Sequence, residues 1–150
     1  MKTYIWALVV TVCITASVTA VHEVGHLIAV EHLVADSSIN FGVTRHMGVA
    51  FITGSVRMPD AYYTSMDLFL IGLAGPLWGF LLSLIIFWTT KDAITAIVCS
   101  FFMFYQGVYC ITEPLKSLGL MDTFTSLLIP ITAAIIWIMW YASDVKRSMS

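Results

Sequence analysis

The chain has 150 residues, of which 59% are hydrophobic and 11% are charged, and its formal net charge is −2. A soluble domain carries about 25% charged residues, so this composition excludes an ordinary soluble protein and indicates apolar surface that faces lipid. The sequence contains no basic run, which excludes an electrostatic surface for nucleic acid. The length fits a single membrane-embedded domain over residues 1–150.

Four stretches contain no Asp, Glu, Lys or Arg: residues 3–22, 68–90, 93–112 and 123–143. Each is close to the length of about 20 residues with which a helix spans a bilayer. Backbone groups in lipid must be hydrogen-bonded within their own segment, which favours helices over isolated strands. We therefore predict an all-α, multi-pass integral membrane protein with helices over about 4–33, 63–90, 93–112 and 123–143.

The first apolar stretch also resembles a signal peptide. Lys2, the apolar run and the small residues "VTA" at 18–20 are typical of such a segment, with cleavage after Ala20. The apolar pattern continues past that point as "GHLIAVEHLV". This continuation favours one helix that extends to about Leu33.

The one sizeable polar segment lies between the first two predicted helices. Within it, "SINFGV" and "GVAFITGSV" are β-rich and partly alternating, and "TRHMG" between them supplies a turn. The sequence predicts a short β-hairpin over about 37–58. The hairpin is either a connector or an exposed strand edge that pairs with an extended peptide.

The first helix carries the sequence "HEVGH", in which His22 and His26 are four residues apart. On a helix this spacing places both imidazoles on one face, where they can reach one zinc ion at about 2.0–2.1 Å. Glu23 can then act as the general base that takes a proton from water acidified by the metal. Gly25 leaves room for a neighbouring helix or a substrate.

The membrane setting makes this motif more specific. An ionisable residue at the centre of a membrane helix costs about 2.5–3.5 kcal/mol, so a cluster of three favours a metal that offsets the cost. The alternative is that these residues are solvated at the membrane interface. His32 is poorly placed for the same metal, and His46 falls in the predicted turn, so both are expected to be solvated. Cys13, Cys99 and Cys110 lack metal-ligand spacing and are expected to be small core residues.

Two segments resemble the site-2 protease family of intramembrane zinc metalloproteases. "HEVGHLIAVEH" resembles the family's zinc-binding signature, and "LIGLAGPLWGFLLSLI" at 70–85 resembles its Ala-Gly-Pro segment, here Ala74, Gly75 and Pro76. The family often has Asn three positions after that proline, where this chain has Gly79. The resemblance covers residues 15–125 and implies a minimal core of three helices. It also implies that the hairpin and the active site face the cytoplasm.

The resemblance further implies that an aspartate after the third helix is the third zinc ligand. The corresponding segment is "YCITEPLKSLGLMDTF" at 109–124, with Asp122 after Leu120 and Met121. Thr123 stands where the family has Gly, and Glu113 and Pro114 stand where it has Asn and Pro. We select Asp122 as the ligand over Glu113, although Asp122 also suits the N-cap of the fourth helix.

The resulting expectation is an intramembrane zinc metalloprotease with Zn²⁺ held by His22, His26 and Asp122, and with Glu23 as catalytic base. Its partners would be the lipid bilayer and a membrane-embedded or membrane-proximal protein substrate. The alternative is a non-catalytic zinc-binding membrane protein or an inactive relative of the proteases. Glu23 separates the two, because structural zinc binding needs the histidines but no adjacent carboxylate.

Overall fold

The computed structural model describes residues 2–33, 38–46, 49–57 and 63–148. The elements, in chain order, are α1 (Lys2–Leu33), β1 (Ser38–His46), β2 (Val49–Arg57), α2 (Ser65–Thr89), α3 (Ala93–Ser117) and α4 (Thr123–Ser148). All four helices are long and apolar enough to cross a membrane, by length and composition. The prediction of a multi-pass membrane protein with four helices and a β-hairpin is confirmed.

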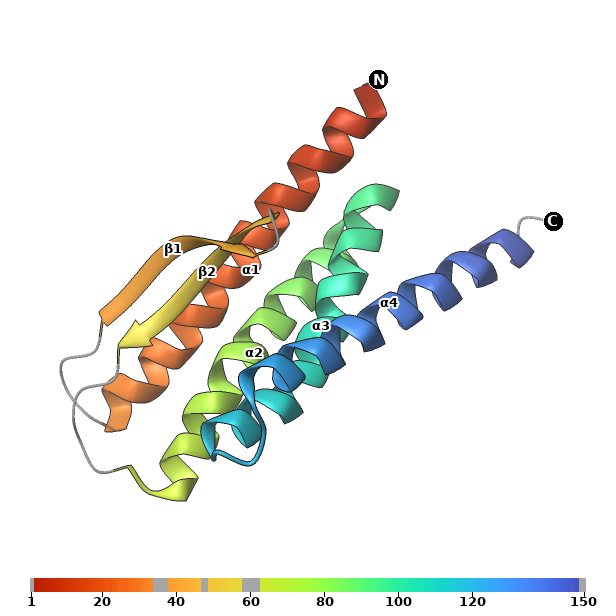
Figure 1. Ribbon diagram of the computed structural model, residues 1–150. Coiled ribbons are helices and arrows are strands. Elements are labelled where there is room, and N and C mark those ends of the chain that lie inside the picture. The colour runs from red at the N-terminus through yellow and green to blue at the C-terminus, as the bar shows by residue number, and fades with distance from the viewer. Residues whose placement is uncertain (1, 34–37, 47–48, 58–62, 149–150) are drawn as a thin grey trace.

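The helices pack in the order of the chain (Figure 1). α2 lies between α1 and α3, and α4 packs on α3. Small residues allow the closest approach, as in other membrane helix pairs. A Cβ atom added to Gly25 of α1 would lie 2.7 Å from the Ala74 carbonyl oxygen of α2. Of the two roles considered for Gly25, the structure therefore supports close packing by a neighbouring helix.

The third helix is longer than the sequence predicts. α3 continues past residue 112 to Ser117, with Pro114 inside it. The apolar criterion ends the helix at the first charged residue, Glu113, although a helix can continue through a charge that is placed on a suitable face. The extension is decisive for the site, because it places Glu113 on the same helix face as Gln106, two turns away.

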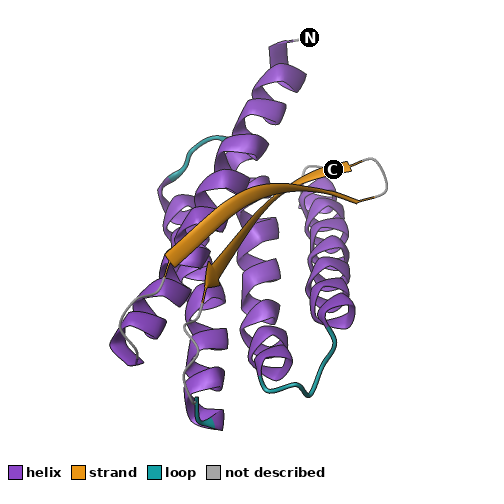
Figure 2. Cartoon of the chain, turned by 60° about the vertical axis from the view of Figure 1, so that its left-hand side comes forward, coloured by secondary structure: helices purple, strands orange, loops and turns teal. Residues whose placement is uncertain are grey.

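The hairpin lies beside α1, which it contacts mainly through β2 (Figure 2). Its two strands are antiparallel and pair in a regular register from Ser38 with Arg57 to His46 with Val49. His46 thus ends β1, and residues 47 and 48 of the predicted turn lie outside the described residues, as do 37 and 58. Ser55 and Val56 bring β2 to the edge of a cavity beside α1.

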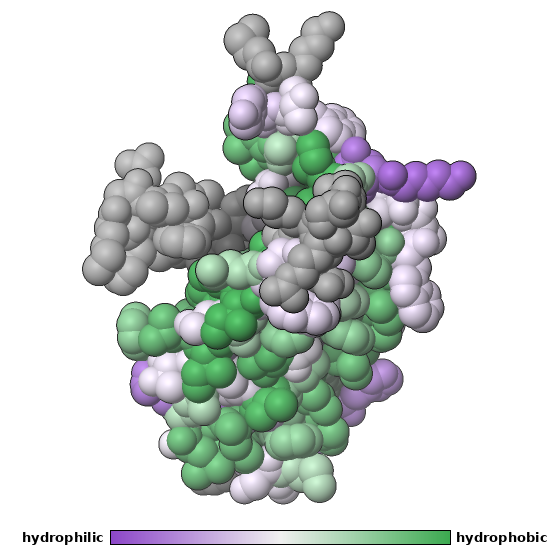
Figure 3. Space-filling view, turned by 90° about the vertical axis from the view of Figure 1, so that its right-hand side faces the viewer, coloured by the Kyte–Doolittle hydropathy of each residue, from purple (hydrophilic) through white to green (hydrophobic). Residues whose placement is uncertain are grey.

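Hydrophobic side chains cover the outer faces of the helices (Figure 3). Exposed examples occur on every helix, among them Trp6, Trp78, Ile111 and Trp140. An apolar surface of this extent is suited to lipid and not to water. The buried residues include a cluster of Val10, Ile14, Val18 and Cys99 between α1 and α3. Cys99 is thus buried as expected, whereas Cys13 is exposed.

Candidate metal centre

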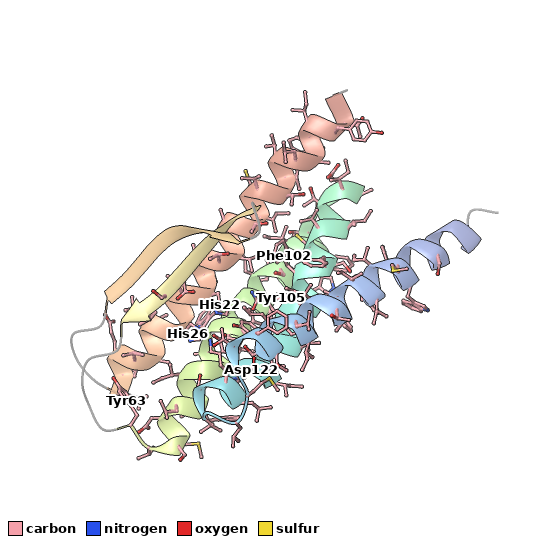
Figure 4. The ribbon with its side chains drawn as sticks, in the orientation of Figure 1. His22, His26, Tyr63, Phe102, Tyr105 and Asp122 are labelled. Carbon is pink, nitrogen blue, oxygen red and sulfur yellow. The ribbon has the colours of Figure 1, made fainter. Side chains whose placement is uncertain are left out.

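α1 presents the two histidines of the motif to α2 and α3. His22 and His26 are 8% and 9% exposed, so neither is a solvated interfacial side chain in the protein. Their Nε2 atoms lie 3.1 Å apart. Figure 4 shows both rings beside α2 and α3 at about the middle of the bundle. His32, by contrast, is exposed at the end of α1.

The third member of the cluster is Glu113 of α3. Its Oε2 atom lies 3.2 Å from His22 Nε2, and its Oε1 atom lies 3.5 Å from His26 Nε2. His22, His26 and Glu113 offer ligand atoms that all lie within 4.8 Å of one another. Two ligand atoms of a tetrahedral zinc site are about 3.3 Å apart for bonds of about 2.0–2.1 Å, so these separations suit one ion.

The selection of Asp122 as third ligand is not supported by the structure. Asp122 is exposed and precedes α4, where Oδ1 accepts a hydrogen bond of 2.9 Å from the Thr125 backbone N–H. Oδ2 accepts a second bond of 2.6 Å from the Thr125 hydroxyl. These two bonds hold the pKa of Asp122 below its ordinary value. Asp122 is therefore an N-cap, and the alternative considered for the ligand, Glu113, lies beside the histidines.

The outer nitrogen of each histidine has a hydrogen-bond acceptor. His26 Nδ1 donates to the Ile71 carbonyl oxygen at 2.6 Å, and His22 Nδ1 donates to Gln106 Oε1 at 3.2 Å. A neutral imidazole that donates from Nδ1 presents a lone pair at Nε2. Both Nε2 lone pairs therefore point into the cluster, which is the tautomer that a metal-binding histidine requires.

The cluster therefore brings acceptor atoms of three side chains together. Lys116 Nζ donates to Glu113 Oε1 at 3.4 Å, whereas Oε2 of Glu113 is buried without a hydrogen-bond partner among the described residues. A buried acceptor without a partner is unfavourable. A divalent cation at the centre would satisfy all three side chains, and a nitrogen and oxygen ligand set of this kind suits zinc.

α2 carries the small residues that make space for these contacts. A Cβ atom on Gly75 would lie 2.3 Å from His26 Nε2, so only glycine admits the ring there. A Cβ atom on Gly79 would lie 2.9 Å from Gln106 Cδ. Gly79 stands where the resembling family often has Asn, and in this protein the space holds the amide that contacts His22.

Glu23 is buried and lies next to the cluster. It lines two cavities, one shared with His26 and one shared with His22. The first, here called the polar cavity, has a volume of about 270 Å³ and is lined by Glu23, His26, Ser55, Val56, Ile71, Glu113, Lys116 and Ser117. Glu23 thus borders two cavities, each of which also contains one of the two histidines.

Three residues of the site were not singled out in the sequence. Gln106 contacts His22, the Tyr109 ring stacks on the His22 ring with centroids 5.7 Å apart, and Lys116 Nζ lies 3.4 Å from Glu113 Oε1. Gln106 could have been identified from the sequence, because a polar amide within a membrane span is costly without a hydrogen-bond partner. No pattern within the third helix identifies Tyr109, because an aromatic residue is ordinary there.

Comparison of the chain with models of protein families, with curated proteins and with solved structures finds no match. The resemblance to site-2 proteases therefore depends on the two sequence motifs alone.

Proposed function

We propose that the protein is an intramembrane zinc metalloprotease whose metal ligands are His22, His26 and Glu113. The observation that carries the proposal is the convergence of three buried acceptor groups, with Glu23 beside them and open to two cavities. A site with structural zinc needs four protein ligands, whereas a catalytic site uses three and leaves one position open. The described cluster has three.

The chemistry follows from the placement of these side chains. Bound zinc supplies Lewis acidity, which polarises a carbonyl and makes water easier to deprotonate. Glu23 takes the proton from the attacking water and returns it to the leaving amine. Burial of the site limits bulk water, which strengthens each electrostatic interaction within it. The β2 edge at Ser55 and Val56 borders the polar cavity and provides a place for an extended substrate segment to pair.

The proposal has a first test in metal content. We expect purified protein to contain one zinc per chain, and His26→Ala or Glu113→Gln to lose most of it, because each removes one of three ligands. His32→Ala is the matched control, since His32 lies on the same helix and is exposed. Zinc measured by mass spectrometry after dialysis decides the result. Stoichiometric zinc in His26→Ala would remove the site from this helix.

Catalysis is tested separately at Glu23. We expect Glu23→Gln to keep its zinc and to lose about 10²–10⁴-fold in cleavage rate, the usual cost of removing a general base. Glu31→Gln, an exposed position on the same helix, should cleave like the wild type. The measurement is cleavage of a reconstituted membrane-spanning peptide. Zinc without cleavage in the wild type would favour the alternative, a non-catalytic zinc-binding membrane protein.

A further inference from the structure

A second cavity also borders Glu23. Its volume is about 260 Å³, and we call it the aromatic cavity. It is lined by Thr15, Val18, Thr19, His22, Glu23, Phe102, Tyr105, Gln106, Tyr109 and Leu127. Figure 4 shows Phe102 and Tyr105 on α3, and both line this cavity together with His22. The aromatic cavity therefore begins at the candidate metal ligands and extends along α1 and α3.

The two cavities differ in charge. The polar cavity contains Lys116 and Glu113 in addition to Glu23. The aromatic cavity contains Glu23 as its one carboxylate among the lining residues, at the end next to the candidate metal ligands, together with three aromatic rings, of which Tyr109 stacks on His22. Thr15, which also lines it, has its hydroxyl bonded to the Thr11 carbonyl oxygen at 2.7 Å. Val18, Leu127 and the faces of the aromatic rings give this cavity an apolar surface against which an apolar side chain can pack.

Three helices line this cavity: α1 and α3 contribute most of the lining residues, and α4 contributes Leu127. In the described part of the chain, α1 and α4 do not pack against each other. Consecutive Cα atoms are about 3.8 Å apart. If the scissile carbonyl of a substrate lies beside Glu23, the side chain of the neighbouring substrate residue can therefore reach the cavity that Glu23 lines.

We infer that the aromatic cavity receives the side chain of the substrate residue next to the scissile bond, and that this side chain is bulky and apolar, such as Leu or Phe. The inference rests on the proposed protease function and adds the substrate class to it. Specificity of this kind is a difference in how well the site holds related substrates near the transition state. Gly or Ala at the same position would leave the cavity unfilled.

The probe is a synthetic membrane-spanning peptide with the central sequence Gly-Gly-X-Gly-Gly, where X is Gly, Ala, Leu or Phe. It is reconstituted with the full chain in phosphatidylcholine vesicles, and products are identified by mass spectrometry. We expect cleavage next to X, about 10- to 100-fold faster for Leu or Phe than for Gly, the range typical of an apolar pocket. Equal rates for all four peptides would overturn the inference.

A filled cavity provides the second arm. Thr19 is partly buried and lines the cavity, so Thr19→Phe places a ring inside it. We expect this variant to cleave the Ala, Leu and Phe peptides at similar rates, and thus to lose its preference for Leu and Phe. Thr11→Phe is the matched control, because Thr11 lies two turns earlier on α1, is exposed and does not line this cavity. Thr11→Phe should keep the preference for Leu and Phe. If Thr19→Phe also kept this preference, the inference would be contradicted.

Binding separates failure of this inference from failure of the protease function. Glu23→Gln lacks the general base, so it should retain uncut peptide, and it should retain the Phe peptide at least 10-fold better than the Gly peptide. Selective retention without cleavage by the wild type would reject the protease function and leave the cavity as a binding site. Cleavage by the wild type with unselective retention would reject the cavity assignment alone.

Discussion

Gln106 is the clearest example of a single residue whose role depends on its partner. Its side chain is 4% exposed within a membrane-spanning helix, and its Oε1 accepts from His22 Nδ1. A metal-binding histidine is oriented by the group that its second nitrogen contacts, and loss of that group typically costs 10–100-fold in metal affinity or activity, an order-of-magnitude range. Ile71 provides the same contact for His26 through a backbone carbonyl, which no side-chain substitution removes.

We therefore predict that Gln106→Leu lowers zinc affinity by about 10–100-fold. Gln106→Glu retains an acceptor for His22 Nδ1 and should recover most of that loss. Competition with a chromophoric chelator measures the affinity without reference to cleavage. Equal affinity of Gln106→Leu and the wild type would show that His22 is oriented without this amide.

A second prediction at this scale separates the two acidic candidates. Glu113→Gln should lose zinc, because a neutral amide is a poorer ligand than a carboxylate. Asp122→Asn should keep zinc, because Asp122 caps α4 and Asn is also a good N-cap. Zinc content of the two purified variants is the measurement. Loss of zinc in Asp122→Asn alone would restore Asp122 as the ligand.

At the level of the helix, α2 acts as a thin spacer between the two helices that carry the candidate ligands. Gly72 faces Pro114 and Ser117 of α3, and Gly75 faces His26 of α1. The cap of α2 fixes where these glycines fall, because the Thr64 hydroxyl accepts from the Asp67 N–H and the Asp67 carboxylate accepts from the Thr64 N–H. Small residues on both faces let α1 and α3 approach from opposite sides.

We predict that Gly75→Ala disrupts the metal site although alanine favours the helix by about 1 kcal/mol. The added methyl group would meet the His26 ring at 2.3 Å, so the ring must leave its position. Gly107→Ala is the matched control on α3, since its methyl group would meet Phe80 at an ordinary 3.6 Å. Zinc content should fall in the first variant and stay unchanged in the second.

At the scale of the whole molecule, four successive crossings place the two ends of the bundle on opposite sides of the membrane. Residues 90–92 join α2 to α3 at one end, and residues 118–122 join α3 to α4 at the other, the end at which α1 ends and α2 begins (Figure 1). Basic residues do not select an orientation from the sequence, which predicts Lys2, Lys91, Lys146 and Arg147 on one side and Arg45, Arg57 and Lys116 on the other.

The crossing of α3 is directly testable. After replacement of Cys13, Cys99 and Cys110, single cysteines at the exposed positions Lys91 and Leu120 should react with a membrane-impermeant maleimide from opposite sides of sealed vesicles. A cysteine that faces the vesicle lumen should react only after the membrane is permeabilised. Labelling of both positions from the same side would show that α3 does not span the bilayer.

The sequence alone determined the membrane class, the four helices, the hairpin and the one-face placement of His22 and His26. These features depend on composition and on the local period of a helix or strand, which neighbouring residues define. Tertiary structure decided the rest: the position of Glu113, and not Asp122, beside the two histidines, the contacts of Gln106 and Tyr109 with His22, and the two cavities. Each of these depends on which turn of α3 lies opposite α1, and that is set by packing across α2. The hydrophobic residues before Asp122 are equally compatible with a metal ligand and with a helix N-cap at that position. In the structure, α3 extends through Pro114, and Asp122 lies at the start of α4, away from the histidines.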